Sequence, residues 1–388
     1  MKYNAKYEVK GEKVAKDINK KKYSEETQLK LDIFAEFFRE WFPVFINNIH
    51  IEKIYILDLF AGSGSDIEDN LGSPLKLLQK AKGENRMHCS KINKQITFIF
   101  NELKKTKLEE LKKNVNEYIS KCKAENNCGD ICIYENNIKY FNDDFLDFFN
   151  ISRLTDVLKN KKYAKFFLLD QYGFKLINKD IFLKLVESPK TDFIFFISSS
   201  YIKRFKDIDA VKNHIDTSKF TDDEKGFKES HREIAKYYKN FISDYREYYL
   251  HHFTIKKGAN YYGLIFGTNH TLGMEKFLKV CWKHDKLAGE SNCNINNDNE
   301  EYSLFFDENS TAKKNQIRED IRNKIISSEI KDNISGLKYT IKKGGLAELY
   351  IEVIEELKKS NKVNIIGKFN RQASNIHNAK LYNIEVIK

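Results

Sequence analysis

Five short apolar runs, each followed by a stretch with helical periodicity, constrain the fold of this 388-residue chain most strongly. The runs are KIYILDLF, ITFIFNEL, ICIYENN, AKFFLLDQYG and DFIFFISSS, which begin at residues 53, 96, 131, 164 and 192. Short strands that alternate with helices predict an α/β fold in which crossover connections join a mostly parallel sheet.

A hairpin after the fifth run decides which α/β fold we expect. Two β-type runs surround KKGAN within residues 251–269, and such a pair predicts a β-hairpin whose closing strand is antiparallel. A parallel sheet that ends in this way is the layout of Rossmann-like methyltransferases. Residues 26–49 carry apolar side chains at helical spacing, and they predict a helix over a sheet edge or a substrate mouth, with its aromatic stripe in the core.

The chain divides into three predicted parts. A basic arm spans residues 1–22, and a methyltransferase-like domain spans 23–290 with a helical insertion, rich in Tyr and charge, at about 203–250. The polar break SNCNINNDNEE begins the last part, 291–388, in which helical stretches and a short β-hairpin give the outline of a winged helix.

Composition argues against a membrane protein and is compatible with a polyanionic partner. No apolar run approaches the ~18 residues of a membrane span, and the N-terminus lacks the apolar core of a secretory signal. Lys and Arg outnumber Asp and Glu by 67 to 56, which gives a net charge of +11. The one cysteine cluster, CKAENNCGDIC, has no zinc-ligand spacing, so we expect reduced thiols, a cytoplasmic protein and no metal.

The segment YILDLFAGSGSD contains the first candidate ligand site. Asp58 ends a predicted strand, and Phe60, Ala61, Gly62 and Gly64 turn the chain toward the next helix. Ligands of open α/β sheets bind outside the carboxyl ends of the strands, where glycines let the backbone approach them. The turn lacks the dinucleotide G-x-G-x-x-G spacing and the Lys-Ser/Thr pair of a P-loop, whereas D-x-F-x-G-x-G suits S-adenosylmethionine. Asp58 would face the amino group of this ligand; the alternative is an ordinary strand-to-helix turn.

Two further strand ends offer acids to the same ligand. Glu102 follows ITFIFN, where a carboxylate would bind the two ribose hydroxyls or would only begin a helix as a solvated residue. Asp143 or Asp144 follows the third strand and would contact the adenine amino group. We prefer Asp144 for this role, although the same residue is nearly as well suited to cap the next helix.

The fourth strand end, FFLLDQYGF, carries the candidate catalytic residues. In amino-methylating enzymes this position has an acidic or amide residue followed by an aromatic one. Asp170 would accept a hydrogen bond from the target amine, and Tyr172 would stack on the base or donate its hydroxyl. In the alternative interpretation, Asp170 only caps the turn and Tyr172 packs behind it.

Together these segments resemble the three-Cys-motif partner (TcmP) family of methyltransferase-like proteins. The similar pieces lie between Tyr23 and Gly289, and they are EWFPVF, DLFAGSG, GSPL, FLLDQYGF and the late LGMEKF…WK. DLFAGSG occurs in many methyltransferases, but GSPL, D-x-Y-G and LGMEKF in this order are more specific to the family.

The resemblance implies a methyltransferase that uses S-adenosylmethionine. It implies ligand contacts by Asp58, Gly62, Gly64 and Glu102, a loop over the ligand from Gly72, Ser73 and Pro74, and a catalytic corner of Asp170, Tyr172 and Gly173. It also implies a partner protein with three cysteines, of the phage Gp37/Gp68 type. The chain departs from the family at Gln171, where a Pro is usual and would rigidify the catalytic turn.

Basic residues near aromatic ones are the candidate nucleic-acid contacts. Lys276, Lys279 and Lys283 lie near Trp282 and would hold phosphate while the indole stacks on a base. The alternative is a solvated helix face with Trp282 buried. The other candidates are Tyr201, Lys203, Arg204 and, in the wing of the winged helix, Arg371.

Three functions are compatible with these patterns. We expect a methyltransferase that modifies a base amino group or ring nitrogen of RNA or DNA, with a three-Cys-motif partner in phage or mobile-element conflict. The second function is that of a catalytically inactive, methyltransferase-like protein that binds nucleic acid and docks a partner, which Gln171 favours. The third is a metal-dependent nuclease, which would need ligands from Asp58, Asp170 and the Asp143–Asp144 pair.

Overall fold

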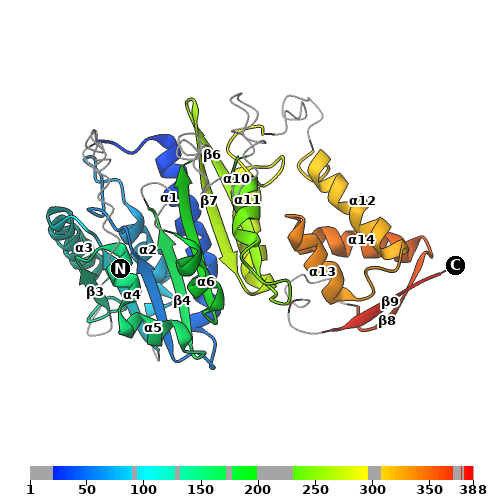
Figure 1. Ribbon diagram of the computed structural model, residues 1–388, viewed down its shortest axis with the longest axis horizontal. Helices are drawn as coiled ribbons and strands as arrows, with labels where there is room; N and C mark the ends of the chain where they lie inside the picture. Colours follow the sequence, from blue (N-terminus) through cyan, green and yellow to red (C-terminus); the bar gives the residue numbers. More distant parts are fainter. Residues whose placement is uncertain are drawn as a thin grey trace, which may run out of the picture.

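A seven-stranded sheet with the order β3-β2-β1-β4-β5-β7-β6 forms the centre of the molecule (Figure 1). The structure is a computed structural model that describes residues 21–89, 94–126, 132–171, 177–198, 230–295, 307–369, 377 and 380–387. The strands of this sheet are β1 (Lys53–Asp58), β2 (Gln95–Asn101), β3 (Ile138–Phe141), β4 (Tyr163–Leu169), β5 (Thr191–Ser198), β6 (Tyr249–Lys257) and β7 (Asn260–Thr268). Strands β1 to β5 pair in parallel, and β7 is antiparallel to both β5 and β6. This is the arrangement of Rossmann-like methyltransferases, so the predicted fold class is confirmed.

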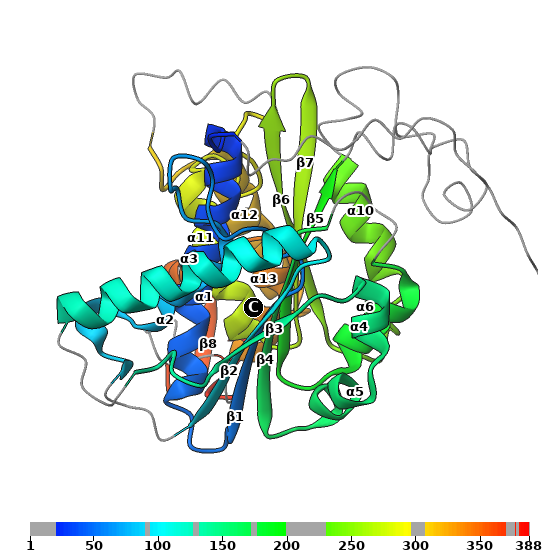
Figure 2. The same ribbon diagram turned by 90° about the vertical axis from the view of Figure 1, so that its left-hand side faces the viewer.

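Helices cover both faces of the sheet, and Figure 2 shows the two layers on either side of the strands. One face carries α1 (Glu25–Ile46), α2 (Ser73–Ala81), α3 (Lys105–Asn126) and α11 (Thr271–His284); the other carries α4 (Phe145–Asn150), α5 (Ser152–Lys159), α6 (Lys179–Glu187) and α10 (Ser230–Lys239). Side chains alternate along the strands and form two cores, one on each face of the sheet. Phe166 and Leu168 enter the first core, on the face covered by α1, while Phe167 and Leu169 enter the second core, on the face covered by α6. Among the described residues, no helix is long and apolar enough to cross a membrane.

Helix α1 lies over inner strands of the sheet, where its aromatic side chains pack. The ring of Phe37 lies 5.8 Å from that of Phe166 on β4 and 4.7 Å from that of Phe266 on β7. Trp41 Nε1 donates a hydrogen bond of 2.6 Å to Asp192 Oδ2 at the amino end of β5. The aromatic stripe of the helix therefore belongs to the core, as expected. At the start of the helix, Glu26 lies 3.8 Å from Lys257 of the edge strand β6.

The predicted strand ICIYENN is wrong. Its described residues, 132–137, form turns, and the strand that pairs with β2 begins only at Ile138. Asn136 has a φ of 58°, which an extended strand does not tolerate. Ile133 and Tyr134 are apolar because they are buried in the first core, where Tyr134 donates its hydroxyl hydrogen to Leu78 O at 2.7 Å.

Beyond α11, the described residues form three helices and a two-stranded sheet, on the right of Figure 1. They are α12 (Ala312–Ile326), α13 (Asn333–Lys342), α14 (Ala347–Lys359) and the antiparallel pair β8 (Val363–Gly367) and β9 (Tyr382–Val386). The sequence pattern predicted helical stretches followed by a short β-hairpin in this part, and the structure contains them. The buried side chains of these elements join the first core, and Trp282 Nε1 of α11 donates to Gly344 O at 2.9 Å. The winged-helix assignment of this part stays a prediction.

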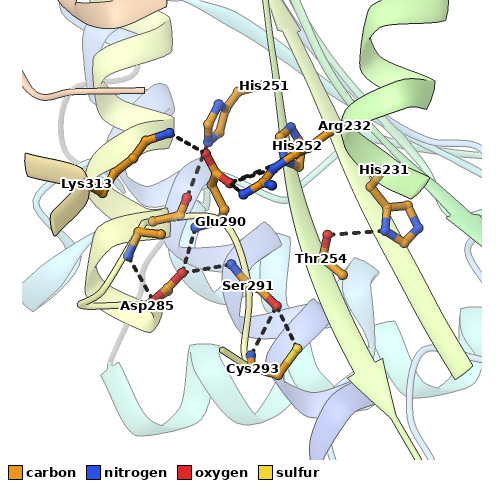
Figure 3. A network of polar contacts seen from close by, with 12 residues as sticks. His231, Arg232, His251, His252, Thr254, Asp285, Glu290, Ser291, Cys293 and Lys313 are labelled. Carbon is orange, nitrogen blue, oxygen red and sulfur yellow. Dashed lines mark hydrogen bonds and ion pairs between the residues drawn. The ribbon is translucent and has the colours of Figure 1, made fainter. Parts of the chain in front are cut away.

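The carboxylate of Glu290 connects the edge of the sheet to two helices, as Figure 3 shows. Arg232 of α10 donates to Glu290 Oε2 through Nε at 3.0 Å, and Lys313 of α12 donates to Oε1 at 3.0 Å. The backbone of the same segment pairs with β6, since Thr254 N–H donates to Glu290 O at 2.7 Å. This segment therefore covers the free edge of β6 and attaches α12 to it.

We expect Trp41→Phe to destabilise the protein by about 1–3 kcal/mol, because a buried carboxylate loses a hydrogen-bond donor. Burial raises the pKa of Asp192 to about 6, against the lowering effects of its bonds to Thr268 and Trp41. A raised pKa means that stability falls as pH rises from about 4 to about 6, and without Trp41 this fall should be larger. Urea unfolding of wild type and variant at about pH 5 and pH 8 measures both effects.

The double variant Trp41→Phe/Asp192→Asn serves as the control, because it has no carboxylate at this position. Its stability loss relative to the single variant Asp192→Asn should be the same at both pH values. An equal loss at both pH values in Trp41→Phe itself would contradict the role given to Asp192.

Candidate functional site

Three acidic side chains meet at the carboxyl edge of the parallel strands. Asp58 is the last residue of β1, Glu102 follows β2 and Asp170 follows β4, and β1 lies between the other two strands. The carboxylates are close enough to interact, since both Glu102 and Asp170 contribute to raising the pKa of Asp58. The structure therefore brings together the three acids that the sequence predicted from separate strand ends.

Asp58 is fully buried, and only one of its carboxylate oxygens has a hydrogen bond. Oδ1 accepts from Phe60 N–H at 3.2 Å, whereas Oδ2 has no hydrogen-bond partner among the described residues. Burial raises the pKa of Asp58 to about 7, although the Ser73 side chain and the Phe60 N–H act in the opposite direction. A buried acceptor without a donor is unusual in a folded protein, and it calls for an explanation.

Glycines determine the path of the chain around this carboxylate. Gly62 and Gly64 have φ values of 63° and 87°, in the left-handed region that favours glycine. Gly72 N–H donates to Gly64 O at 2.7 Å, and a Cβ on Gly72 would lie only 2.9 Å from the same oxygen. The GSPL segment therefore packs against the D-x-F-x-G-x-G turn through backbone contacts, and Ser73 at the start of α2 is buried beside Asp58.

Glu102 fixes the turn after β1 from the neighbouring strand. Its Oε2 accepts from Gly62 N–H at 3.0 Å, and its Oε1 accepts from Lys104 N–H at 2.9 Å. Ala61, which is buried, donates its N–H to Asn101 O at 3.0 Å. Each carboxylate oxygen keeps a second lone pair, so Glu102 is able to accept from a ligand hydroxyl as well.

Asp66 is a structural residue of this turn that the sequence analysis did not single out. Its carboxylate accepts four hydrogen bonds, of 2.7 to 2.9 Å, from Tyr23 N–H, Glu68 N–H, Asn70 N–H and the Asn70 side chain. Burial alone would raise its pKa, but these donors hold the pKa below its usual value. The only signal in the sequence is that an Asp followed by polar residues is typical of such turns.

Asp144 caps the helix that follows β3. Its Oδ1 accepts from Leu146 N–H at 2.8 Å, and its side chain is exposed. The cap that we considered as an alternative role is therefore present, and the contact with adenine stays a prediction. Beside it, the ring of Phe145 lies 5.0 Å from that of Phe60, so that the turn after β1 packs against α4.

The candidate catalytic corner contains an ion pair that the sequence analysis missed. Lys30 Nζ of α1 donates to Asp170 Oδ2 at 2.5 Å. Gln171 is buried, and neither atom of its amide has a hydrogen-bond partner among the described residues. Tyr172 and Gly173 lie outside the described residues.

The lysines proposed to contact nucleic acid are engaged in ion pairs within the protein. Lys276 pairs with Glu40 at 3.1 Å, Lys279 with Glu275 at 3.1 Å and with Glu348 at 3.2 Å, and Lys283 with Glu36 at 2.5 Å. Trp282 is 7% exposed and packs under Lys314, so its indole is not available to stack on a base. The buried Trp282 is the alternative that we considered, and the phosphate contacts stay predictions. Tyr201, Lys203, Arg204 and Arg371 lie outside the described residues.

Comparison with solved structures finds methyltransferases. TYW2 of M. jannaschii, in complex with AdoMet, is 12% identical with a TM-score of 0.30, over 65% of this chain and 78% of TYW2. Trm1 of Pyrococcus horikoshii, with S-adenosyl-L-methionine, is 13% identical with a TM-score of 0.35, over 68% of this chain and 59% of Trm1. A precorrin-6y C5,15-methyltransferase of Geobacter metallireducens is 9% identical with a TM-score of 0.29, over 64% of this chain and 95% of that enzyme.

No protein-family model and no curated protein matches the chain. The resemblance to the three-Cys-motif partner family therefore stays a prediction. Within the part of the chain that the structure describes, no group of three or more His, Cys, Asp or Glu side chains is arranged to hold a metal ion. The chemistry of the site must be inferred from its own residues.

Opposite effects on stability are expected from amide substitutions at the two aspartates of this turn. Asp58→Asn should stabilise the protein by about 1–2 kcal/mol at about pH 8, because the buried charge disappears. The raised pKa of Asp58 lowers wild-type stability as pH rises toward about 7, so the gain from Asp58→Asn should shrink at about pH 5.

Asp66→Asn should destabilise the protein by about 1–2 kcal/mol, because an amide cannot accept all four hydrogen bonds.

Urea unfolding at the two pH values tests this pair of variants. The lowered pKa of Asp66 means that its contribution is present at both pH values and disappears only as pH falls below its usual range. Destabilisation by Asp58→Asn at about pH 8 would show that its Oδ2 has a donor in the free protein.

Proposed function

We propose that this protein is an S-adenosylmethionine-dependent methyltransferase that acts on nucleic acid, at a base amino group or a ring nitrogen. The observation that supports it most is the buried Asp58 Oδ2, which has no donor among the described residues and lies at the carboxyl edge of the sheet with Glu102 and Asp170. This ligand carries an ammonium and a sulfonium, and it offers a donor and positive charge to such a group of acids.

The residues at this edge fit the cofactor part by part. Asp58 would accept from its ammonium group, and Glu102 would accept from the ribose hydroxyls while it keeps its bond to Gly62 N–H. Gly62 and Gly64 leave the turn without side chains where the ligand would approach. The remaining proposed contacts are Phe60, Ala61 and Ser73 around the turn and Asp144 at the adenine amino group.

Asp170 would hold the nitrogen that receives the methyl group. When bound, the cofactor supplies a methyl group on a positively charged sulfur. Asp170 would accept an N–H of the target, which directs the nitrogen lone pair, and no strong base is needed for this positioning role. Tyr172 and Gly173 complete the proposed corner, with Tyr172 as a stacking surface for a flipped base.

Nucleic acid is the proposed substrate class because of the overall charge of +11 and the candidate contact residues in the sequence. Those candidates are Tyr201, Lys203, Arg204, Lys276, Lys279, Lys283 and Arg371. The proposal includes the division into a methyltransferase-like domain at 23–290 and a winged-helix-like region at 291–388. A three-Cys-motif partner in phage or mobile-element conflict is proposed from the family resemblance alone.

A second candidate function is that of an inactive scaffold which keeps the fold but not the chemistry. Two observations favour it: Lys30 occupies Asp170 Oδ2, and Gln171 stands where the family usually has Pro. A scaffold would dock nucleic acid or a partner without methyl transfer.

Isothermal titration with S-adenosylmethionine and S-adenosylhomocysteine tests the proposal. We expect binding in the micromolar range, weakened about ten-fold or more in Asp58→Asn and Glu102→Gln because each loses a charged acceptor. Asp192→Asn is the matched control, because it removes a buried carboxylate at the opposite edge of the sheet, and its affinity should equal that of wild type. Labelled-methyl transfer to RNA and DNA pools then identifies the substrate.

Each outcome has a distinct meaning. The absence of binding to folded wild-type protein, with nucleic acid added, would rule out the methyltransferase. Binding without transfer to either pool would favour the scaffold.

A further inference from the structure

Lys30 is a charged residue on the aromatic face of α1. It precedes Phe34, Phe38 and Trp41 at helical spacing, and these three side chains are buried. The Lys30 side chain is itself only 11% exposed, and its Nζ lies 4.5 Å from the centre of the Phe196 ring. An ammonium in such surroundings needs a carboxylate partner, and Asp170 provides it at 2.5 Å.

The position of this ion pair is unusual because its acid belongs to the candidate catalytic corner. Asp170 is 21% exposed, directly after β4, and it interacts electrostatically with Asp58. Asp58, Glu102 and Asp170 would place three negative charges together if no cation were present. Lys30 compensates one of them, and Phe196 restricts where its ammonium lies.

We propose that Lys30 is a positioning residue which sets both the charge of the candidate cofactor site and the orientation of Asp170. Its ammonium holds Oδ2 of Asp170, so that Oδ1 is the oxygen that accepts from the target. This inference rests on the proposed function, because it assigns Lys30 a role toward the same cofactor and substrate.

A consequence for the substrate follows from the ion pair. A carboxylate that is held by an ammonium is only a hydrogen-bond acceptor. It therefore favours a target nitrogen that carries a hydrogen, such as an exocyclic amine, over a ring nitrogen that presents only a lone pair to the site. Of the two target classes in the proposed function, the base amino group is the one that this pair selects.

The ratio of the dissociation constants for S-adenosylhomocysteine and S-adenosylmethionine measures the charge of the site. The two ligands differ by the methyl group and the positive charge on sulfur, so factors common to both cancel in the ratio. Lys30→Met leaves Asp170 uncompensated and should raise the ratio about five-fold. Asp170→Asn leaves Lys30 uncompensated and should lower it by a similar factor.

Three controls separate this role from a purely structural one. The double variant Lys30→Met/Asp170→Asn and the conservative variant Lys30→Arg should return the ratio to near the wild-type value. Lys76→Met should also leave it unchanged, because Lys76 of α2 forms a similar pair with Asp32 of α1, at 2.6 Å. If Lys30→Met does not fold, Asp170→Asn and the double variant still give the two required comparisons.

The outcomes distinguish this inference from the proposed function. Opposite shifts in the two single variants support the role of Lys30. Unchanged ratios in both variants, with normal binding of both ligands, overturn it and leave the proposed function intact. The failure of wild-type protein to bind either ligand overturns both.

Discussion

The parallel pairing of β1 with β2 on one side and β4 on the other is the constraint on which the site depends. In this register Asp58 lies opposite Phe100 and Leu168, so each neighbouring strand reaches the same edge and ends in an acid a few residues later. The fold thereby concentrates negative charge where Asp58 is buried. Burial is the main cause of the raised pKa of Asp58, and the charges of Asp170 and Glu102 add to it. In the proposed function, this group of acids favours a positively charged ligand.

Helix α1 extends from the amino ends to the carboxyl ends of the parallel strands. Trp41 binds Asp192 at the amino edge, and Lys30 binds Asp170 at the carboxyl edge. Eleven helical residues span roughly 16 Å, which is about the length of a five-residue strand. The aromatic residues between Lys30 and Trp41 pack on the strands, so the position of this one helix determines the surroundings of a structural aspartate and of the candidate catalytic one.

The sequence pattern was sufficient to predict the sheet and the acids at its edge, because burial on both faces gives parallel strands their apolar runs. It failed at ICIYENN, where apolar residues pack in a turn. It also could not show that Lys276, Lys279 and Lys283 pair with Glu40, Glu348 and Glu36, since these three partners lie far away in the chain. The unusual position of Lys30 could have been recognised in the sequence, because helical spacing places this lysine on the aromatic face of the first helix.

Proton release on ligand binding tests the central claim most directly, namely that the Asp58 carboxylate binds the cationic end of the cofactor. Titrations of S-adenosylmethionine at about pH 6.5, in buffers of different ionisation enthalpy, count the protons exchanged. With a pKa of about 7, Asp58 is partly protonated at this pH, so an ammonium that binds it should release a measurable fraction of a proton. The release should be absent in Asp58→Asn. Binding without proton release in the wild type, or with the same release in the variant, would contradict the account.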